Sequence, residues 1–165
     1  MRNGYYWIMR SCSDPRRMEQ KTDEHSYVTQ LSIKRDREVL VMIKIKRVYD
    51  HPSKDDGKRI LIDRLWPRGL KKEDVQIDEW IKDIAPSNQL RKWFNHDPKK
   101  WGEFKNRFFA ELQGKREMVE GIINAARKGT VTLLFGSKEE RFNNAVALKE
   151  YIDAKIHASQ QGKAA

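Results

Sequence analysis

The run Thr130-Val131-Thr132-Leu133-Leu134-Phe135-Gly136-Ser137-Lys138 decides the fold class of this chain. Its first six residues are apolar or β-branched and carry no charge, which is typical of a strand buried on both faces. Gly136-Ser137-Lys138 then forms a tight turn into a predicted last helix, whose inward face carries Ala145, Leu148 and Ile152. A buried strand joined to a helix in this way indicates an α/β domain with a mostly parallel sheet.

Two more strands are predicted upstream of this run. Residues 39–49 alternate apolar and basic side chains, and residues 59–63 are a short apolar run that Trp66-Pro67-Arg68-Gly69 ends. Helices are predicted next: one carrying Ile77, Trp80, Ile81 and Ile84, one capped by Ser87, one opened by Asp97-Pro98, and one ended by Gly129. The fold class is therefore α/β, a single domain whose small, mostly parallel sheet of few strands is covered by about five helices.

The patterning also predicts where the domain lies. Residues 1–41 are polar and lack sustained periodicity, so we expect a poorly ordered extension, explained most simply by a start codon assigned too early. Residues 42–155 carry the strand and helix patterns of the domain, and residues 156–165 are expected to form a flexible tail.

Composition limits the class of protein. The chain has 165 residues with 34 Lys+Arg against 24 Asp+Glu, a net charge of +10, and no apolar run long enough to span a membrane. The single cysteine, Cys12, excludes an internal disulfide and a Cys-x-x-Cys metal site and predicts a cytoplasmic protein. The positive balance leaves two interpretations open, a nucleic-acid-binding surface or a mixed, solvated surface.

Polar residues follow the second predicted strand, at an edge where parallel sheets bind ligands. Arg64 and Arg68 can hold a carboxylate or phosphate, Trp66 can stack on a flat ligand, and Asp63 can orient an arginine or act as a general base. The alternative is structural: Asp63 pairs with an arginine, Trp66 belongs to the core, and Pro67 to Gly69 form a turn.

The end of the last predicted strand offers a second set of candidates. Ser137 and Lys138 at the start of the last helix can bind an anion, and Asn144 can fix its orientation. Ser137 as an ordinary helix cap is the alternative. His96 is a candidate acid–base partner of Asp63, or else a surface histidine. The sequence contains no recognisable metal-ligand cluster, and it identifies no cofactor.

Several blocks of the sequence resemble the YeaO-like branch of domain-of-unknown-function family 488 (DUF488). They include Ile45–Tyr49, Asp63–Gly69, Trp93–Pro98 and Thr132–Leu134, and the resemblance extends from about Met42 to Tyr151. It implies a small α/β domain and places the recurrent polar residues of the family at Asp63, Arg64, Arg68, His96, Lys138 and Asn144. Phe142 stands where the family often has a histidine, which disfavours a mechanism that needs that histidine as an acid or base.

The sequence therefore predicts an uncharacterised cytoplasmic protein that binds an anionic small molecule, such as a nucleotide, a phosphate or a carboxylate metabolite. The site lies at the carboxyl ends of the strands, and Asp63 and His96 are the acid–base pair if the protein is an enzyme. A nucleic-acid-binding accessory domain is the alternative. Substrate, reaction and oligomeric state are left open.

Overall fold

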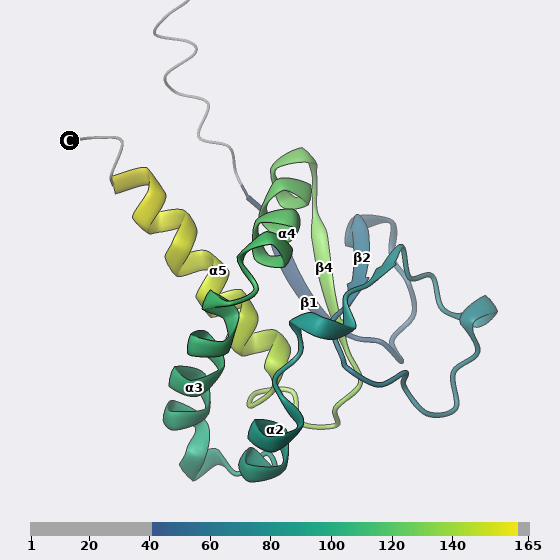
Figure 1. The fold of residues 1–165 in the computed structure, drawn as a ribbon. Coiled ribbons are helices and arrows are strands. Elements are labelled where there is room, and N and C mark those ends of the chain that lie inside the picture. The colour runs from purple at the N-terminus through teal and green to yellow at the C-terminus, as the bar shows by residue number, and fades with distance from the viewer. Residues whose placement is uncertain (1–40, 162–165) are drawn as a thin grey trace, which may run out of the picture. The chain divides into compact units, whose positions relative to one another are not determined.

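The computed structural model describes residues 41–161, and four parallel strands form one sheet in the order β1-β4-β2-β3 (Figure 1). The strands are β1 (Ile43–Arg47), β2 (Lys58–Leu61), β3 (Glu79–Trp80) and β4 (Val131–Phe135). The α-helices are α2 (Asn88–Phe94), α3 (Trp101–Gln113), α4 (Arg116–Lys128) and α5 (Asn144–Gln161). Single 3-10 turns lie at Lys54–Asp56, Lys72–Asp74, Lys82–Ile84 and Pro98–Lys100. The predicted α/β fold with a parallel sheet is confirmed.

Strand β4 occupies the centre of the sheet, as its uncharged sequence predicts. All five of its residues are buried, and it pairs with β1 on one side and β2 on the other. Successive side chains point to opposite faces, so Leu133 and Leu134 enter two different cores.

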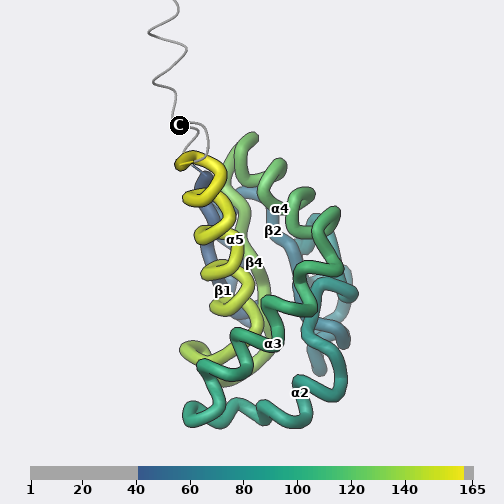
Figure 2. The backbone as a smooth tube through the Cα atoms, turned by 60° about the vertical axis from the view of Figure 1, so that its left-hand side comes forward, coloured from purple at the N-terminus to yellow at the C-terminus, as the bar shows by residue number. Residues whose placement is uncertain are grey.

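The larger core lies between the sheet and the helices. Helix α5 contacts β1 and β4, α4 contacts β4, and α3 packs against both helices; Figure 2 shows the three helices on the same side of the strands. The helices bury an apolar stripe each, as the i, i+3, i+4 spacing requires. The largest fully buried side chains of these helices are Phe104, Phe108, Leu112, Ile122, Leu148 and Ile152.

The other face of the sheet carries a smaller apolar core and a buried polar group. Leu61 and Leu134 pack there under the connection between β2 and β3, which contributes Trp66, Leu70, Val75 and Ile77. Asp56 is buried beside this core, where it accepts hydrogen bonds from Lys46 at 3.1 Å and from Arg59. Burial alone would raise the pKa of Asp56, but the bonds from the Ser53 N–H, Lys46 and Arg59 outweigh it and lower the pKa below its usual value.

The predicted helix around Ile77 to Ile84 is wrong. The segment instead forms strand β3 followed by a 3-10 turn, although Ile84 is fully buried and Ile81 packs on the core as the spacing predicts. The Asp78 N–H bonds Arg59 O and the Ile81 N–H bonds Leu61 O, both at 2.9 Å. These bonds give the edge carbonyl groups of β2 partners within the sheet, which a separate helix would not supply.

The other element boundaries agree more closely with the sequence. The Ser87 side chain caps α2, Asp97 and Pro98 open the turn that leads into α3, and Gly129 ends α4. Helix α5 extends to Gln161, so residues 156–161 of the expected tail are helical. The expectation for residues 1–41 lies outside the described residues except for its last position. No helix within residues 41–161 is long and apolar enough to cross a membrane.

Candidate functional site

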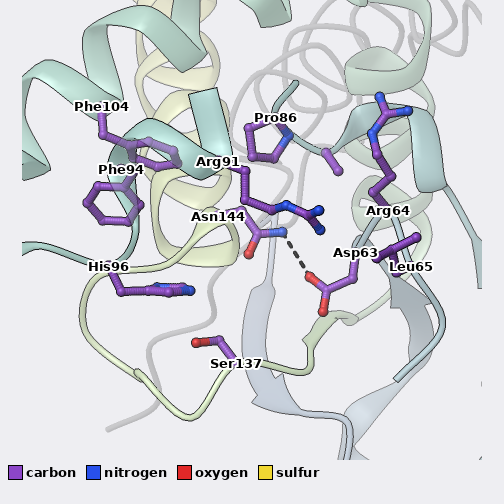
Figure 3. A pocket seen from close by; sticks show the side chains of 11 residues that line it. Asp63, Arg64, Leu65, Pro86, Arg91, Phe94, His96, Phe104, Ser137 and Asn144 are labelled. Atoms are coloured by element: carbon purple, nitrogen blue, oxygen red, sulfur yellow. Dashed lines mark hydrogen bonds between the residues drawn. The ribbon is translucent and has the colours of Figure 1, made fainter. Parts of the chain in front are cut away.

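A cavity of about 190 Å³ opens where β2 and β4 end, and we call it the strand-end cavity (Figure 3). Parallel strands bring their carboxyl ends to one edge, so the segments after Ile62 and after Phe135 meet there as predicted. Helix α2, the turn after it and the start of α5 complete the wall. The lining residues are Asp63, Arg64, Leu65, Ala85, Pro86, Arg91, Phe94, His96, Phe104, Ser137 and Asn144.

Asp63 connects three parts of the chain at this edge. Its Oδ2 accepts a hydrogen bond from the Gly136 N–H at 2.7 Å, and its Oδ1 accepts one from Asn144 Nδ2 at 3.0 Å. Burial raises the pKa of Asp63 above its usual value, while these two bonds and the charges of Arg91 and His96 lower it in part. Asp63 is thus a desolvated carboxyl that fixed donors hold in one orientation.

The start of α5 differs from the prediction. The helix begins at Asn144 rather than after Lys138, and the residues between follow an irregular loop. The fully buried Asn143 caps the helix, because its Oδ1 accepts from the Ala145 and Val146 N–H groups at 2.9 and 3.1 Å. Those N–H groups are therefore already satisfied, which removes the helix terminus that was expected to bind an anion.

Ser137 lines the cavity from the loop that leads to α5. Its Oγ accepts from the Glu139 N–H at 3.0 Å, which leaves the hydroxyl hydrogen able to donate to a ligand. The carbonyl of Ser137 accepts from Arg47 Nε at 3.1 Å, so this part of the loop is anchored to the end of β1.

His96 enters the cavity from an unusual turn after α2. Asn95 and His96 have φ values of 45° and 55°, a left-handed conformation that Asn and His tolerate better than most residues. His96 Nδ1 lies 3.0 Å from the carbonyl oxygen of Phe142. Because a carbonyl only accepts, Nδ1 carries the hydrogen of this contact, and Nε2 is the ring nitrogen that remains for a ligand.

Arg91 is the one charged residue of the cavity lining that the sequence did not single out. Its guanidinium points toward the Asp63 carboxylate in Figure 3, yet Arg91 forms no ion pair within 4.0 Å with any residue of the described part. A signal was present, since Arg91 lies three residues before the buried Phe94 and so shares its side of α2. Arg64 extends the other way, toward Asp83 Oδ1 at 4.0 Å.

The structure brings together five of the predicted site residues and leaves three outside. Asp63, Arg64, His96, Ser137 and Asn144 line the strand-end cavity. Trp66, Arg68 and Lys138 do not. The Trp66 ring packs on the smaller core and its Nε1 donates to Leu70 O at 2.7 Å. Arg68 and Lys138 are exposed.

A family model described as the inactive DUF488-N3 subclade matches residues 42–165. The chain belongs to the DUF488 family. Two uncharacterized proteins are similar to this chain over nearly their whole length. YeaO of Escherichia coli (strain K12) is 41% identical over 110 residues, which cover 67% of this chain and 96% of YeaO. Rv3073c of Mycobacterium tuberculosis (strain ATCC 25618 / H37Rv) is 32% identical over 113 residues, 68% of this chain and 95% of Rv3073c.

The comparisons support the YeaO-like assignment of this DUF488 protein and leave its activity open, because both relatives are uncharacterized. No solved structure matches the chain. Within residues 41–161, no group of three or more His, Cys, Asp or Glu side chains is arranged to hold a metal ion.

Proposed function

We propose that this protein binds a small anionic molecule in the strand-end cavity, with Arg91 as its main charge contact. The observation that carries the proposal is the position of Arg91, an arginine that lines a cavity and has no ion pair with another described residue. A guanidinium in that position can make a forked, charge-assisted hydrogen bond to a carboxylate or phosphate. The Ser137 hydroxyl would donate to the same ligand, and Arg64, which extends toward Asp83, would add only longer-range positive charge.

Size favours a carboxylate or phosphate metabolite over a nucleotide. The cavity of about 190 Å³ is smaller than the roughly 300–1,000 Å³ of sites that enclose drug-sized ligands. Part of the wall is fixed by packing and hydrogen bonding: the rings of Phe94 and Phe104 stack with their centroids 4.1 Å apart, and Lys115 Nζ donates to the Ala85 carbonyl at 2.7 Å. Such a site suits a compact ligand.

Binding without catalysis is the form of the proposal that we favour. The family description is that of an inactive subclade, and both Asp63 oxygens already accept hydrogen bonds from protein groups. Asp63 and His96, the acid–base pair expected from the sequence, act as ligand contacts in this account. The single cysteine supports a reducing compartment, so we place the protein in the cytoplasm.

Nucleic-acid binding receives less support from the arrangement of charges. Lys44 Nζ donates to Asp55 O at 2.7 Å, and Lys46 pairs with Asp56 at 3.1 Å. These two lysines of β1 are therefore engaged by the acidic turn that follows the strand. We do not propose this function.

A thermal-shift screen against small carboxylates and phosphates tests the proposal. We expect at least one of them to raise the melting temperature of the wild-type protein at concentrations well above its Kd. Arg91→Ala should abolish that shift, because it removes the forked contact. Arg68→Ala is the matched control, since Arg68 and Arg91 are both exposed but only Arg91 lines the cavity. An equal shift in wild type and Arg91→Ala would contradict the proposal.

A further inference from the structure

The strand-end cavity contains opposite charges that do not pair with each other. The Arg91 guanidinium and the Asp63 carboxylate both line it, and their nitrogen and oxygen atoms are not within the 4.0 Å of an ion pair. They are still close, since the charge of Arg91 lowers the pKa of Asp63. A cavity that needed only to hold an anion would be weakened by a carboxylate so near its arginine, because the two negative groups repel.

Asp63 keeps hydrogen-bonding capacity that the protein does not use. A carboxylate has about four acceptor positions. The Gly136 N–H takes one on Oδ2 and Asn144 Nδ2 takes one on Oδ1, which leaves one on each oxygen. The partly buried carboxylate therefore offers two acceptor positions to a ligand.

The neighbouring groups add acceptors on the same side. Asn144 uses its amide nitrogen on Asp63, so its Oδ1 is available to accept. His96 Nδ1 donates to the Phe142 carbonyl, so a neutral His96 ring would present Nε2 as a further acceptor. Figure 3 shows both side chains among those that line the cavity together with Arg91 and Asp63. The cavity thus combines one cationic hydrogen-bond donor, Arg91, with a set of hydrogen-bond acceptors around Asp63.

We propose that the ligand is a small zwitterion, of the size of an amino acid, whose anionic group binds Arg91 and whose ammonium group binds Asp63. This inference rests on the proposed function and narrows its ligand class. The ammonium offers three donors, which suits the acceptor positions of Asp63 and Asn144. The cavity of about 190 Å³ is below the range of sites for drug-sized ligands, roughly 300–1,000 Å³, which suits a molecule of amino-acid size.

Calorimetric titration of matched ligand pairs tests the inference on the wild-type protein. The pairs are α-amino acids with the carboxylates that lack the amino group, and phosphoethanolamine with ethyl phosphate. We expect at least one zwitterion to bind about tenfold or more tightly than its partner, the effect of one charge-assisted hydrogen bond at a partly buried carboxylate. Asp63→Asn should reduce this preference to about twofold or less, because it removes the negative charge.

The outcomes separate the inference from the function on which it rests. Equal or tighter binding of the simple anions would contradict the inference that the ligand is a zwitterion, but it would agree with the proposed anion site. Failure of every member of both sets to bind would overturn both. The comparison within a pair is made on the wild-type protein, so it decides the question even if Asp63→Asn does not fold. The double variant Asp63→Asn, Asn144→Asp exchanges the amide and the carboxylate of this hydrogen-bonded pair. Because a carboxylate is again present at the same place, the variant should regain the preference for the zwitterion.

Discussion

Asp63 joins segments that lie more than seventy residues apart in the sequence. It follows β2, and its two oxygens accept from Gly136 after β4 and from Asn144 at the start of α5. A Cβ atom at position 136 would lie 3.1 Å from Asp63 Oδ2, so glycine allows the strand end to approach the carboxylate this closely. The proposed ligand contact and the local packing of the cavity therefore involve the same residue.

The pH dependence of stability should change when Asp63 is replaced by Asn. Burial raises the pKa of Asp63 above its usual 3.8. Between pH 3.8 and the raised pKa, the folded state keeps a proton on Asp63 that the unfolded state has released. The free energy of unfolding therefore falls as the pH rises through this range, and it stays constant above the raised pKa. Asp63→Asn cannot titrate and should lack this decline. Urea unfolding at several pH values between about 4 and 7 measures the difference.

Asp56 does not disturb this comparison, although it acts in the opposite direction. Because the pKa of Asp56 is lowered in the folded state, its carboxylate stabilises the fold at pH values above the usual pKa of 3.8. This stabilisation is lost as the pH falls from 3.8 through the lowered pKa. The residue is present in both proteins, so its effect cancels in the difference. Parallel pH profiles for wild type and Asp63→Asn would contradict the account of Asp63.

At the residue scale, the rule on strand ends predicted the place of the cavity and part of its wall. Asp63 and Ser137 follow parallel strands directly, so position alone brings them to one edge. Trp66 and Arg68 belong to the next turn, which carries the chain onto the other face of the sheet, where apolar packing decides the orientation of Trp66. Arg91 was missed because it comes from α2, whose placement beside the strand ends is a tertiary result.

At the element scale, the loop between β4 and α5 shows what the sequence could not predict. A tight turn was expected after Phe135, but the chain runs through several irregular residues before Asn143 caps the helix. Asn143 Nδ2 also donates to the carbonyls of Glu139 and Glu140 at 2.9 and 3.0 Å. One buried amide thus closes the loop and starts the helix. Two adjacent asparagines indicated a hydrogen-bonding role, but they did not indicate where the helix begins.

Replacing Asn143 by Ala should destabilise the protein by at least about 2 kcal/mol. The change removes a helix cap and leaves buried backbone groups without partners. Urea unfolding measures the loss of unfolding free energy. Asn124→Ala is the matched control, because Asn124 lies on α4 and, among residues 41–161, its side chain bonds only Arg127 in an exposed pair. Equal effects of the two substitutions would show that Asn143 is not the cap.

At the scale of the molecule, the fold class was the most predictable property, because the five uncharged residues of β4 predict a buried parallel strand. The wrong prediction of a helix over Ile77 to Ile84 also arose at the scale of the whole sheet. Helical spacing was present, but β2 needed a partner at its open edge, and a pairing between distant segments cannot be inferred from local periodicity.

A chain that begins at Met42 should fold with a melting temperature within about 2 °C of the full chain. The family match starts at residue 42, and matches of 110 and 113 residues cover 96% of YeaO and 95% of Rv3073c. Thermal unfolding followed by circular dichroism measures both proteins. A chain that begins at Val48 is the control, since it lacks β1 and should not fold. A clearly lower melting temperature for the chain from Met42 would show that residues 1–41 contribute to stability.

The central claim, that an anion binds in the strand-end cavity, is tested most directly by nuclear magnetic resonance. The ¹⁵N-labelled protein is titrated with the carboxylate or phosphate that raises its melting temperature most, or with inorganic phosphate if none does. We expect the largest chemical-shift changes at the amides of Leu65, Gly136, Ser137 and Asn144, and we expect Arg91→Ala to suppress them. Changes confined to Lys44–Lys46 on β1, or no saturable change at the cavity, would contradict it.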